Sequence, residues 1–416
     1  MKYANSLKYI NSFEVADNLA ELSLKRIREM CLELGRINVG AKCIVTPKAC
    51  AGHASAVMLE SVIKSARYKV GRITSEYGFD SRTSVYLDGD IAAIEDYNKC
   101  VAEIKSFVIK HPDEKYYRQE IVFVLSLLLC KLHGCEFIIL EGLSDEGYSL
   151  DSLCAPFDLV VVPTVYSADN DIGVKVACDA IRRGVREVVS GNQKNAIYAA
   201  ISNACMLSGI RLNVTAKPTF SVSSKSARRV EFSYAGRDGY VLKSPSIILR
   251  DCAMLVIESA LALRRDGIKM PWGSIASGLE LCNNVGCFDM LSAAPAVVVD
   301  SADSAEEISS VLDTFEETVE PLSEMTVCIK SDDYNSLISQ LKAFEGKKTQ
   351  KLIVFGVSNV ENAALHNKYE VIFCSSVLDA AKQVYQAFKE KRTVFCFGGV
   401  AFAQKIKTEF IKLMGL

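Results

Sequence analysis

The stretch IVTPKACAGHASAVMLESVIKSARYKVGRITS, residues 44–75, decides the fold that the sequence predicts. Its first residues are apolar and β-branched, as in a buried strand, and residues 54–66 have the apolar period of an amphipathic helix. A strand that turns directly into a helix is how phosphate-binding loops are built. The intervening segment KACAGHAS (48–55) has one glycine and no lysine after it. The stretch therefore predicts the shape of a phosphate loop without its usual residues.

Short β-branched runs alternate with helical periods along the rest of the chain, which predicts an α/β fold with a mostly parallel sheet covered by helices on both faces. The expected strands are 42–46, 137–141, 159–163, 187–190 and 211–214. The expected helices between them are 54–66, 119–132, 173–183 and 192–208.

The later part of the chain predicts a second domain. Residues 220–241 alternate like antiparallel strands, and a helix is expected at 251–265. The segment SAAPA (292–296) is interpreted as a linker. The strands expected after it are 297–300, 326–330, 352–355, 371–373 and 393–397. We therefore expect a large phosphate-loop-type domain at 1–291 and a smaller, Rossmann-like α/β domain at 297–416.

The composition excludes several classes of protein. The 416 residues include 48 basic and 50 acidic side chains, a balance that argues against a nucleic-acid partner. The longest apolar run, 121–130, is about half the ~20 residues of a membrane span, and the first residues lack the apolar core of a signal peptide. Four dispersed histidines do not suggest a zinc site. We expect a soluble cytoplasmic protein with no membrane partner.

Fifteen cysteines are scattered singly, without a Cys-x-x-Cys pair. This usage predicts reduced thiols buried in apolar segments rather than a disulfide framework. The examples in the most apolar segments are Cys43, Cys130, Cys178, Cys205 and Cys396.

Several segments resemble, in order, those of the Mur ligase superfamily, and most closely folylpolyglutamate synthase, also called dihydrofolate synthase. CEFIILEGL (135–143) resembles the family's VDxAVLEVGLGG, and AVVVDSADSAEEISSVLDTF (296–315) resembles its LVILDGAHNPxAxxxLxxTL. The start of the chain resembles the family's opening helix pair, and 54–92 resembles its next helix, strand and loop. The resemblance implies a ligase that uses ATP and magnesium to phosphorylate a carboxylate, which an amino acid, usually glutamate, then attacks.

The nucleotide positions that the resemblance implies are only partly kept. Aligned on the serine of the family's Gly-Thr-Asn-Gly-Lys-Gly-Ser loop, the chain keeps Gly52 and Ser55 and has His53 in place of the lysine. That lysine supplies a fixed positive charge, which a histidine near neutral pH does not. In the second domain, Asp300 matches the aspartate of the family's D-G-A-H-N, whose His and Asn are missing.

The positions of the family's magnesium ligands are also matched only in part. Glu120 lies 21 residues before Glu141, the spacing of a magnesium ligand in the family, and Asp169 is the nearest counterpart of its histidine ligand. The helix dipole alone would explain Glu120, and a helix cap would explain Asp169. Arg182 and Arg183 stand where the family has a lysine that becomes carbamylated, and an arginine cannot form that carbamate.

The combined losses favour a relative that no longer ligates and serves as a binding or regulatory subunit, with an active ligase or another enzyme of the pathway as its partner. ATP and magnesium are expected as cofactors only in the second interpretation, an active ligase with a diverged site. A third interpretation is a rebuilt site in which Cys50 and His53 are the catalytic candidates. The acidic residues around it would be Glu141, Asp145, Glu146 and Asp169.

Overall fold

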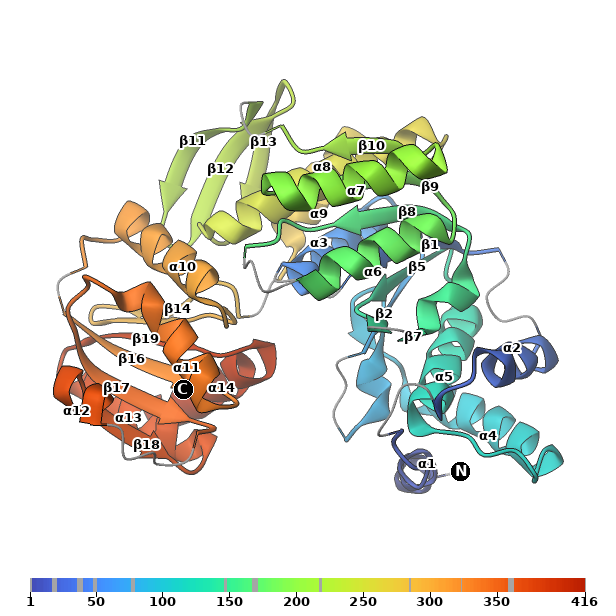
Figure 1. Cartoon of the computed structure of the whole chain (residues 1–416), viewed down its shortest axis with the longest axis horizontal. Helices are drawn as coiled ribbons and strands as arrows, with labels where there is room; N and C mark the ends of the chain where they lie inside the picture. Colours follow the sequence, from blue (N-terminus) through green and yellow to red (C-terminus); the bar gives the residue numbers. More distant parts are fainter. Residues whose placement is uncertain are drawn as a thin grey trace. The chain divides into compact units, whose positions relative to one another are not determined.

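The computed structural model describes residues 2–16, 21–35, 40–47, 51–75, 79–145, 148–166, 171–216, 219–283, 286–322, 324–357 and 363–415. The chain divides into two compact units (Figure 1). Unit 1 consists of Met1–Lys217 and Cys252–Cys282, and unit 2 consists of Pro218–Asp251 and Asn283–Leu416. The segment that was expected to alternate like antiparallel strands, 220–241, belongs to unit 2.

Unit 1 is built on an eight-stranded sheet in the order β10-β9-β8-β1-β5-β2-β3-β4. The pairings from β10 to β2 are parallel, and those of β3 with β2 and β4 are antiparallel. The strands are β1 (Lys42–Thr46), β2 (Val70–Thr74), β3 (Val85–Leu87), β4 (Asp90–Ile91), β5 (Phe137–Glu141), β8 (Phe157–Val162), β9 (Val185–Ser190) and β10 (Arg211–Val214). A two-stranded ribbon of β6 (Ser144–Asp145) and β7 (Tyr148–Ser149) follows β5.

Helices cover both faces of this sheet, as the alternation predicts. Figure 1 shows α6 and α7 on the face opposite α3, α8 and α9. The helices of unit 1 are α1 (Tyr3–Asn11), α2 (Leu24–Glu33), α3 (Gly52–Ser65), α4 (Ile94–Lys110), α5 (Arg118–His133), α6 (Asp171–Arg182), α7 (Asn195–Ser208), α8 (Ile247–Arg265), which begins in unit 2, and α9 (Trp272–Leu281).

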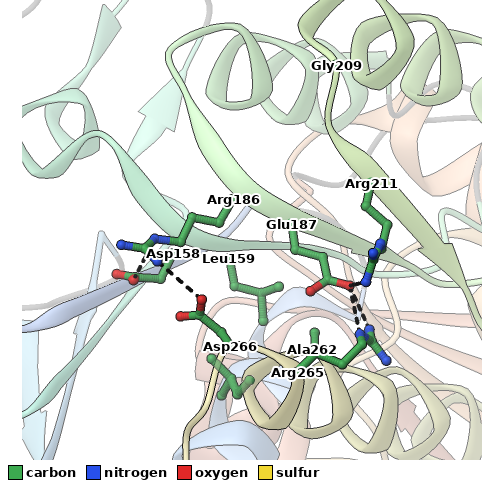
Figure 2. Close-up of a pocket in the computed structure, with 10 residues that line it drawn as sticks. Asp158, Leu159, Arg186, Glu187, Gly209, Arg211, Ala262, Arg265 and Asp266 are labelled. Carbon is green, nitrogen blue, oxygen red and sulfur yellow. Dashed lines mark hydrogen bonds and ion pairs between the residues drawn. The ribbon is translucent and has the colours of Figure 1, made fainter.

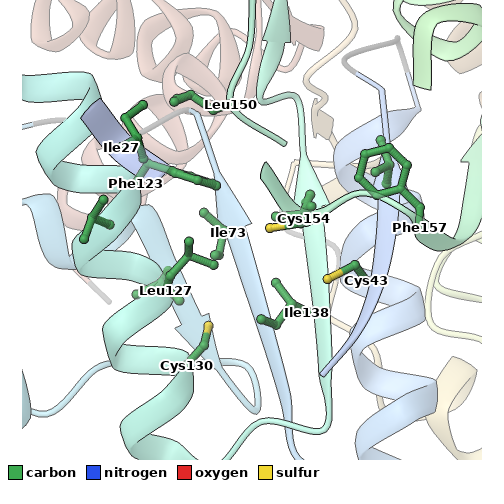
Figure 3. Packing of buried hydrophobic residues seen from close by; sticks show 14 of the residues in the cluster. Ile27, Cys43, Ile73, Phe123, Leu127, Cys130, Ile138, Leu150, Cys154 and Phe157 are labelled. Atoms are coloured by element: carbon green, nitrogen blue, oxygen red, sulfur yellow. The ribbon is translucent and has the colours of Figure 1, made fainter. Parts of the chain in front are cut away.

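One hydrophobic core of unit 1 lies between the sheet and the helices α1, α2, α4, α5, α6 and α7. The residues of α3, α8 and α9 that are buried form further apolar packing. Figure 3 shows Ile27 and Phe123 of two helices packed toward Ile73 and Ile138 of two central strands. The thiols expected to be buried are buried, because they lie on the core-facing sides of their strands and helices. They are Cys43, Cys130, Cys178, Cys205 and Cys396.

Unit 2 contains a six-stranded sheet in the order β14-β15-β19-β16-β17-β18, parallel except for β14, and an antiparallel sheet of β11, β12 and β13. Its strands are β11 (Ser221–Ser226), β12 (Arg229–Tyr234), β13 (Arg237–Leu242), β14 (Asp289–Ala293), β15 (Ala296–Val299), β16 (Met325–Lys330), β17 (Thr349–Phe355), β18 (Glu370–Cys374) and β19 (Thr393–Phe397). Its helices are α10 (Ala305–Thr318), α11 (Tyr334–Leu341), α12 (Ala363–Lys368), α13 (Val377–Lys389) and α14 (Val400–Met414).

The expected fold class, an α/β chain with two mostly parallel sheets, is confirmed. The segment SAAPA, interpreted from the sequence as a linker, forms the end of β14, a tight turn and the first residue of β15. Among the described residues, none of the helices combines the length and the apolar character that crossing a membrane requires.

The helix α3 is held in place by an unusually close contact with α9. A Cβ added at Gly278 would lie 2.5 Å from Val62 Cα, so only glycine permits this approach. The Ser61 hydroxyl donates a hydrogen bond of 2.7 Å to the Gly278 carbonyl at the same point. The contact fixes the helix whose first turn borders the candidate site.

We expect Gly278→Ala to lower the free energy of unfolding by about 1–3 kcal/mol, because the added methyl group forces the two helix backbones apart. Urea unfolding measures this effect. The matched control is Gly273→Ala on the same helix, where an added Cβ meets nothing within 4 Å. That variant should be neutral or more stable by up to about 1 kcal/mol, from helix propensity. Equal effects of the two substitutions would contradict the close-packing account.

Candidate functional site

The candidate site lies at the carboxyl edge of the central strands of unit 1. Glu141 ends β5 and is in register with Thr46 at the end of β1 and Thr74 at the end of β2. Helix α3 starts at Gly52, shortly after β1. In open parallel sheets, ligands bind at this edge, so the expected phosphate-loop position is where a ligand would be placed.

The start of α3 has no side-chain cap among the described residues. A Cβ at Gly52 would lie 2.8 Å from the Pro47 carbonyl oxygen, which explains the single glycine of the loop. The first helical hydrogen bond runs from the Ser55 N–H to the Ala51 carbonyl at 3.0 Å. The loop residues 48–50 lie outside the described part of the chain, and Cys50 is one of them.

Four side chains at this edge of the sheet are joined by hydrogen bonds. His53 Nδ1 lies 2.8 Å from Glu141 Oε1, and Arg72 donates to Glu141 Oε2 at 2.7 Å. On its other side Arg72 Nε donates to Glu60 Oε2 at 2.7 Å. The Gly89 N–H donates to the second Glu60 oxygen at 2.8 Å. Every oxygen of the two carboxylates therefore has a partner within the protein.

This ion-pair chain, defined as His53, Glu141, Arg72 and Glu60, is almost entirely buried. The last three are buried, whereas the side chain of His53 is 34% exposed. The Arg72 guanidinium also lies 4.4 Å from the centre of the Tyr86 ring, a cation–π contact. Buried charges are tolerated when they are paired in this way.

The pKa values of the two glutamates follow from this arrangement. Burial tends to raise the pKa of Glu141, but the hydrogen bond with His53 and the charge of Arg72 hold it below its ordinary value. Burial raises the pKa of Glu60, and Arg72 and the Gly89 N–H offset only part of that rise. Glu141 is thus kept as a carboxylate whose charge is already neutralised from inside the protein.

Two hydroxyl groups lie beside this chain of charges. Within the described residues, Thr46 Oγ1 and Ser55 Oγ are buried and have no hydrogen-bond partner. A buried hydroxyl without a partner is unfavourable by roughly 1–3 kcal/mol. Ser55 is the residue on which the sequence was aligned with the family's phosphate loop, and its hydroxyl is one of these two.

Glu120, a further candidate from the sequence, has partners of its own. Glu120 is fully buried at the start of α5, where it accepts from the Ser23 and Tyr117 N–H groups and from Arg26, at 2.6, 3.0 and 2.9 Å. Asp169 and Glu146 lie outside the described residues, as does the side chain of Asp145.

Asp300 belongs to unit 2. It accepts backbone hydrogen bonds from Phe288 and Ala302, at 2.6 and 2.8 Å, and so fixes the turn after β15.

ATP with magnesium does not fit the residues that the structure describes here. At nucleotide sites magnesium is usually held by one or two carboxylates together with waters and phosphate oxygens. Here the carboxylates of Glu60, Glu120 and Glu141 are each already paired with donors of the protein. No group of three His, Cys, Asp or Glu side chains that could hold a metal occurs in the described ranges. Among the described residues of the site, the Arg72 guanidinium carries a positive charge, and it faces the two glutamates.

Sequence reasoning missed Arg72 and Glu60. Each is a single charged residue in an apolar element, Arg72 in the strand VGRIT and Glu60 in the helix segment VMLESVI. Charged side chains are almost never buried without a partner, so these two positions carried a signal. What the sequence did not contain was the identity of the partners.

A cavity of about 300 Å³ opens at the opposite, amino-terminal edge of the same sheet (Figure 2). Figure 2 shows two sets of ion pairs on its walls. Arg186 pairs with Asp266 at 3.2 Å, and Arg265 with Glu187 at 2.7 Å. These side chains neutralise one another and connect β9 to the end of α8. We therefore assign the cavity a structural role.

The whole chain is similar in fold to solved folylpolyglutamate synthases. The Thermotoga maritima protein matches with a TM-score of 0.73 at 18% identity, over 99% of this chain and 96% of that chain. The Mycobacterium tuberculosis synthase complexed with ADP matches with 0.78 at 15% identity, over 98% and 99% of the two chains. The Lactobacillus casei synthetase matches with 0.74 at 15% identity, over 99% and 100%. No protein-family model and no curated protein matches the sequence.

These likenesses confirm the fold that the sequence resemblance predicted, the two-part α/β fold of folylpolyglutamate synthases. At 15–18% identity they speak for the fold alone. The chemistry of the site has to be argued from its own residues.

We expect Arg72→Met to lower the free energy of unfolding by about 3–5 kcal/mol, because it leaves Glu60 and Glu141 buried without a cation. Equilibrium urea unfolding measures the loss. Arg182→Met is the control, since Arg182 and its partner Asp179 are both exposed, and it should change stability by less than about 1 kcal/mol. If Arg72→Met were no more harmful than this control, the ion-pair chain would not stabilise unit 1.

A second prediction concerns Asp300 and pH. Burial raises its pKa to about 7, although backbone N–H groups of Ala302 and Phe288 act in the other direction. A carboxyl group with a raised pKa stabilises the fold most below its unfolded pKa of about 3.9, and this contribution is lost as the pH rises to about 7. Asp300→Asn removes the titration. Between about pH 5 and pH 7.5 the variant should gain about 2 kcal/mol relative to the parent protein. A pH-independent difference in urea unfolding would contradict this assignment.

Proposed function

We propose that this chain is a folylpolyglutamate-synthase-like protein that has lost ATP-dependent glutamate ligation and acts as a non-catalytic binding or regulatory subunit. The observation that carries the proposal is the engagement of both Glu141 oxygens, by His53 at 2.8 Å and by Arg72 at 2.7 Å. Both oxygens of this carboxylate already accept a short hydrogen bond inside the protein, so its charge is compensated by protein groups and not by a metal ion. The partner we propose is an active ligase or another enzyme of the same pathway, in the cytoplasm.

The electrostatics of the site support the loss of turnover. In enzymes that transfer a phosphoryl group, fixed cations stabilise the charge that develops in the transition state, and removing one such group typically lowers the rate by ~10²–10³. Here the lysine position of the loop is His53, whose ring is paired with Glu141. Arg72 points its charge inward, to Glu60 and Glu141, and not toward the start of α3.

A second candidate is retained nucleotide binding, which one observation favours. Ser55 Oγ and Thr46 Oγ1 are buried without partners in the described structure, and the first turn of α3 has no side-chain cap. Backbone N–H groups at a helix start attract phosphate. This candidate covers both an active ligase with a diverged site and a protein that binds nucleotide without using it.

The test is a thermal unfolding measurement with and without ATP and magnesium at about 5 mM, where a ligand with a Kd near 50 µM would add about 2.7 kcal/mol. We expect no shift, and no phosphate release above background when glutamate and a folate are added. An active folylpolyglutamate synthase assayed in parallel is the control.

A thermal shift without turnover would favour the second candidate in its non-catalytic form, and the protein would still be a non-catalytic subunit. Glutamate-dependent phosphate release that disappears in His53→Ala would overturn the proposal.

A further inference from the structure

Two thiols meet between the end of helix α5 and the start of strand β5. Helix α5 ends at His133, and Gly134 follows it with a φ of 76°. The Gly134 N–H donates to the Lys131 carbonyl, and the Cys135 N–H donates to the Cys130 carbonyl, both at 3.0 Å. This is the Schellman pattern of a helix end, in which the side chains of the two residues joined by the longer-range hydrogen bond contact each other. Here those two residues are Cys130 and Cys135.

The neighbouring strand β2 leaves room for both sulfur atoms. A Cβ added at Gly71 on this strand would overlap Cys130 Sγ and lie 3.2 Å from Cys135 Sγ. The two sulfur atoms therefore border the same small space, which the glycine keeps open. Both thiols are free. Hydrogen bonding with the Cys135 thiol, together with burial, raises the pKa of Cys130 well above its ordinary value.

The two thiols differ in their access to solvent. Cys130 is buried, at 1% exposure, whereas Cys135 is partly exposed. Oxidation-sensitive cysteines are typically accessible and lie next to a second cysteine that resolves the first product. The geometry gives Cys135 the first of these roles and Cys130 the second.

We propose that Cys130 and Cys135 form a reversible disulfide by exchange with a low-molecular-weight disulfide such as glutathione disulfide. The Cys135 thiolate attacks one sulfur of the small disulfide, whose S–S bond breaks, and one small thiol leaves with the proton that Cys135 lost. Cys130 Sγ then attacks Cys135 Sγ and displaces the second small thiol, which takes the Cys130 proton. Two protein thiols are oxidised, and one small disulfide is reduced to two thiols. This inference does not depend on the proposed loss of ligation.

The position of the pair favours a reversible link over a permanent one. A disulfide requires Cα atoms roughly 4.4–6.8 Å apart, and two residues joined by a backbone hydrogen bond are close neighbours of this kind. The loop it would close runs only from residue 130 to residue 135, and a disulfide stabilises a protein less when its loop is short. In reducing compartments, protein disulfides are usually transient and redox-sensing. The reduced pair is then the resting form.

A second pair of thiols, in unit 2, provides an internal control. Cys328 of β16 and Cys396 of β19 are in register on neighbouring strands. Hydrogen bonding with Cys396, together with burial, raises the pKa of Cys328. Both residues are fully buried, so a small disulfide does not reach them while the protein is folded. This pair has the proximity of the first pair without its access.

The test is incubation of the full chain with about 5 mM glutathione disulfide near neutral pH, followed by acid quenching, alkylation of the remaining thiols and tryptic mass spectrometry. Trypsin cleaves after Lys131, between the two cysteines, so the disulfide joins two peptides that are otherwise separate. We expect the joined peptides to become the main form, and dithiothreitol to separate them again. Cys328 and Cys396 should be recovered as alkylated thiols.

Two variants separate the roles of the two thiols. Cys130→Ala should accumulate one glutathione on Cys135, because the thiol that completes the second step is gone. Cys135→Ser should leave Cys130 free, with at least about tenfold less bound glutathione than Cys130→Ala, since the buried thiol is not reached. Circular dichroism of each variant checks that the fold is kept.

The inference is overturned if the peptides of Cys130 and Cys135 are not joined after this treatment. It is also overturned if Cys328 and Cys396 become linked to the same extent, because oxidation would then follow unfolding. A link from Cys130 to Cys43 or Cys154, which lie in the same core (Figure 3), would contradict the pairing. Equal amounts of bound glutathione in the two variants would exclude Cys135 as the attacking thiol.

Discussion

The buried guanidinium of Arg72 is the interaction on which the candidate site depends. It stands between Glu60 on α3 and Glu141 at the end of β5, at 2.7 Å from each. Two carboxylates inside a protein repel each other and are strongly unfavourable unless a cation lies between them. Arg72 therefore joins three elements, β2, α3 and β5.

The same interaction also bears on the chemistry that such a fold can support. The strand and the helix that flank a phosphate loop are present, and Gly52 and Ser55 lie in the first turn of that helix. The nearby Glu141 carboxylate is paired within the protein, because His53 and Arg72 together engage its two oxygens. A frame with this arrangement can stay folded without a metal ion to neutralise its own carboxylates.

Much of the fold could be predicted from local sequence patterns. The bounds expected for β1, β5 and β10 match the structure, because each is a short β-branched run bounded by turn residues. Helix α8 begins at Ile247, four residues before the expected start. Ser246 caps it by accepting a hydrogen bond from the Leu249 N–H, a cap signal that the prediction did not use. In the site, the pairing of His53 with Glu141 joins residues 88 positions apart. Contacts of that separation depend on strand order, which local periodicity does not contain.

The most direct test of this account is a double-mutant cycle between Arg72 and Glu141. The stabilities of Arg72→Met, Glu141→Gln and the double variant, each measured by urea unfolding, give the coupling free energy of the pair. Because both side chains are buried and joined at 2.7 Å, the account predicts a favourable coupling of about 2 kcal/mol or more. A coupling close to zero would contradict it, since Glu141 would then not depend on Arg72.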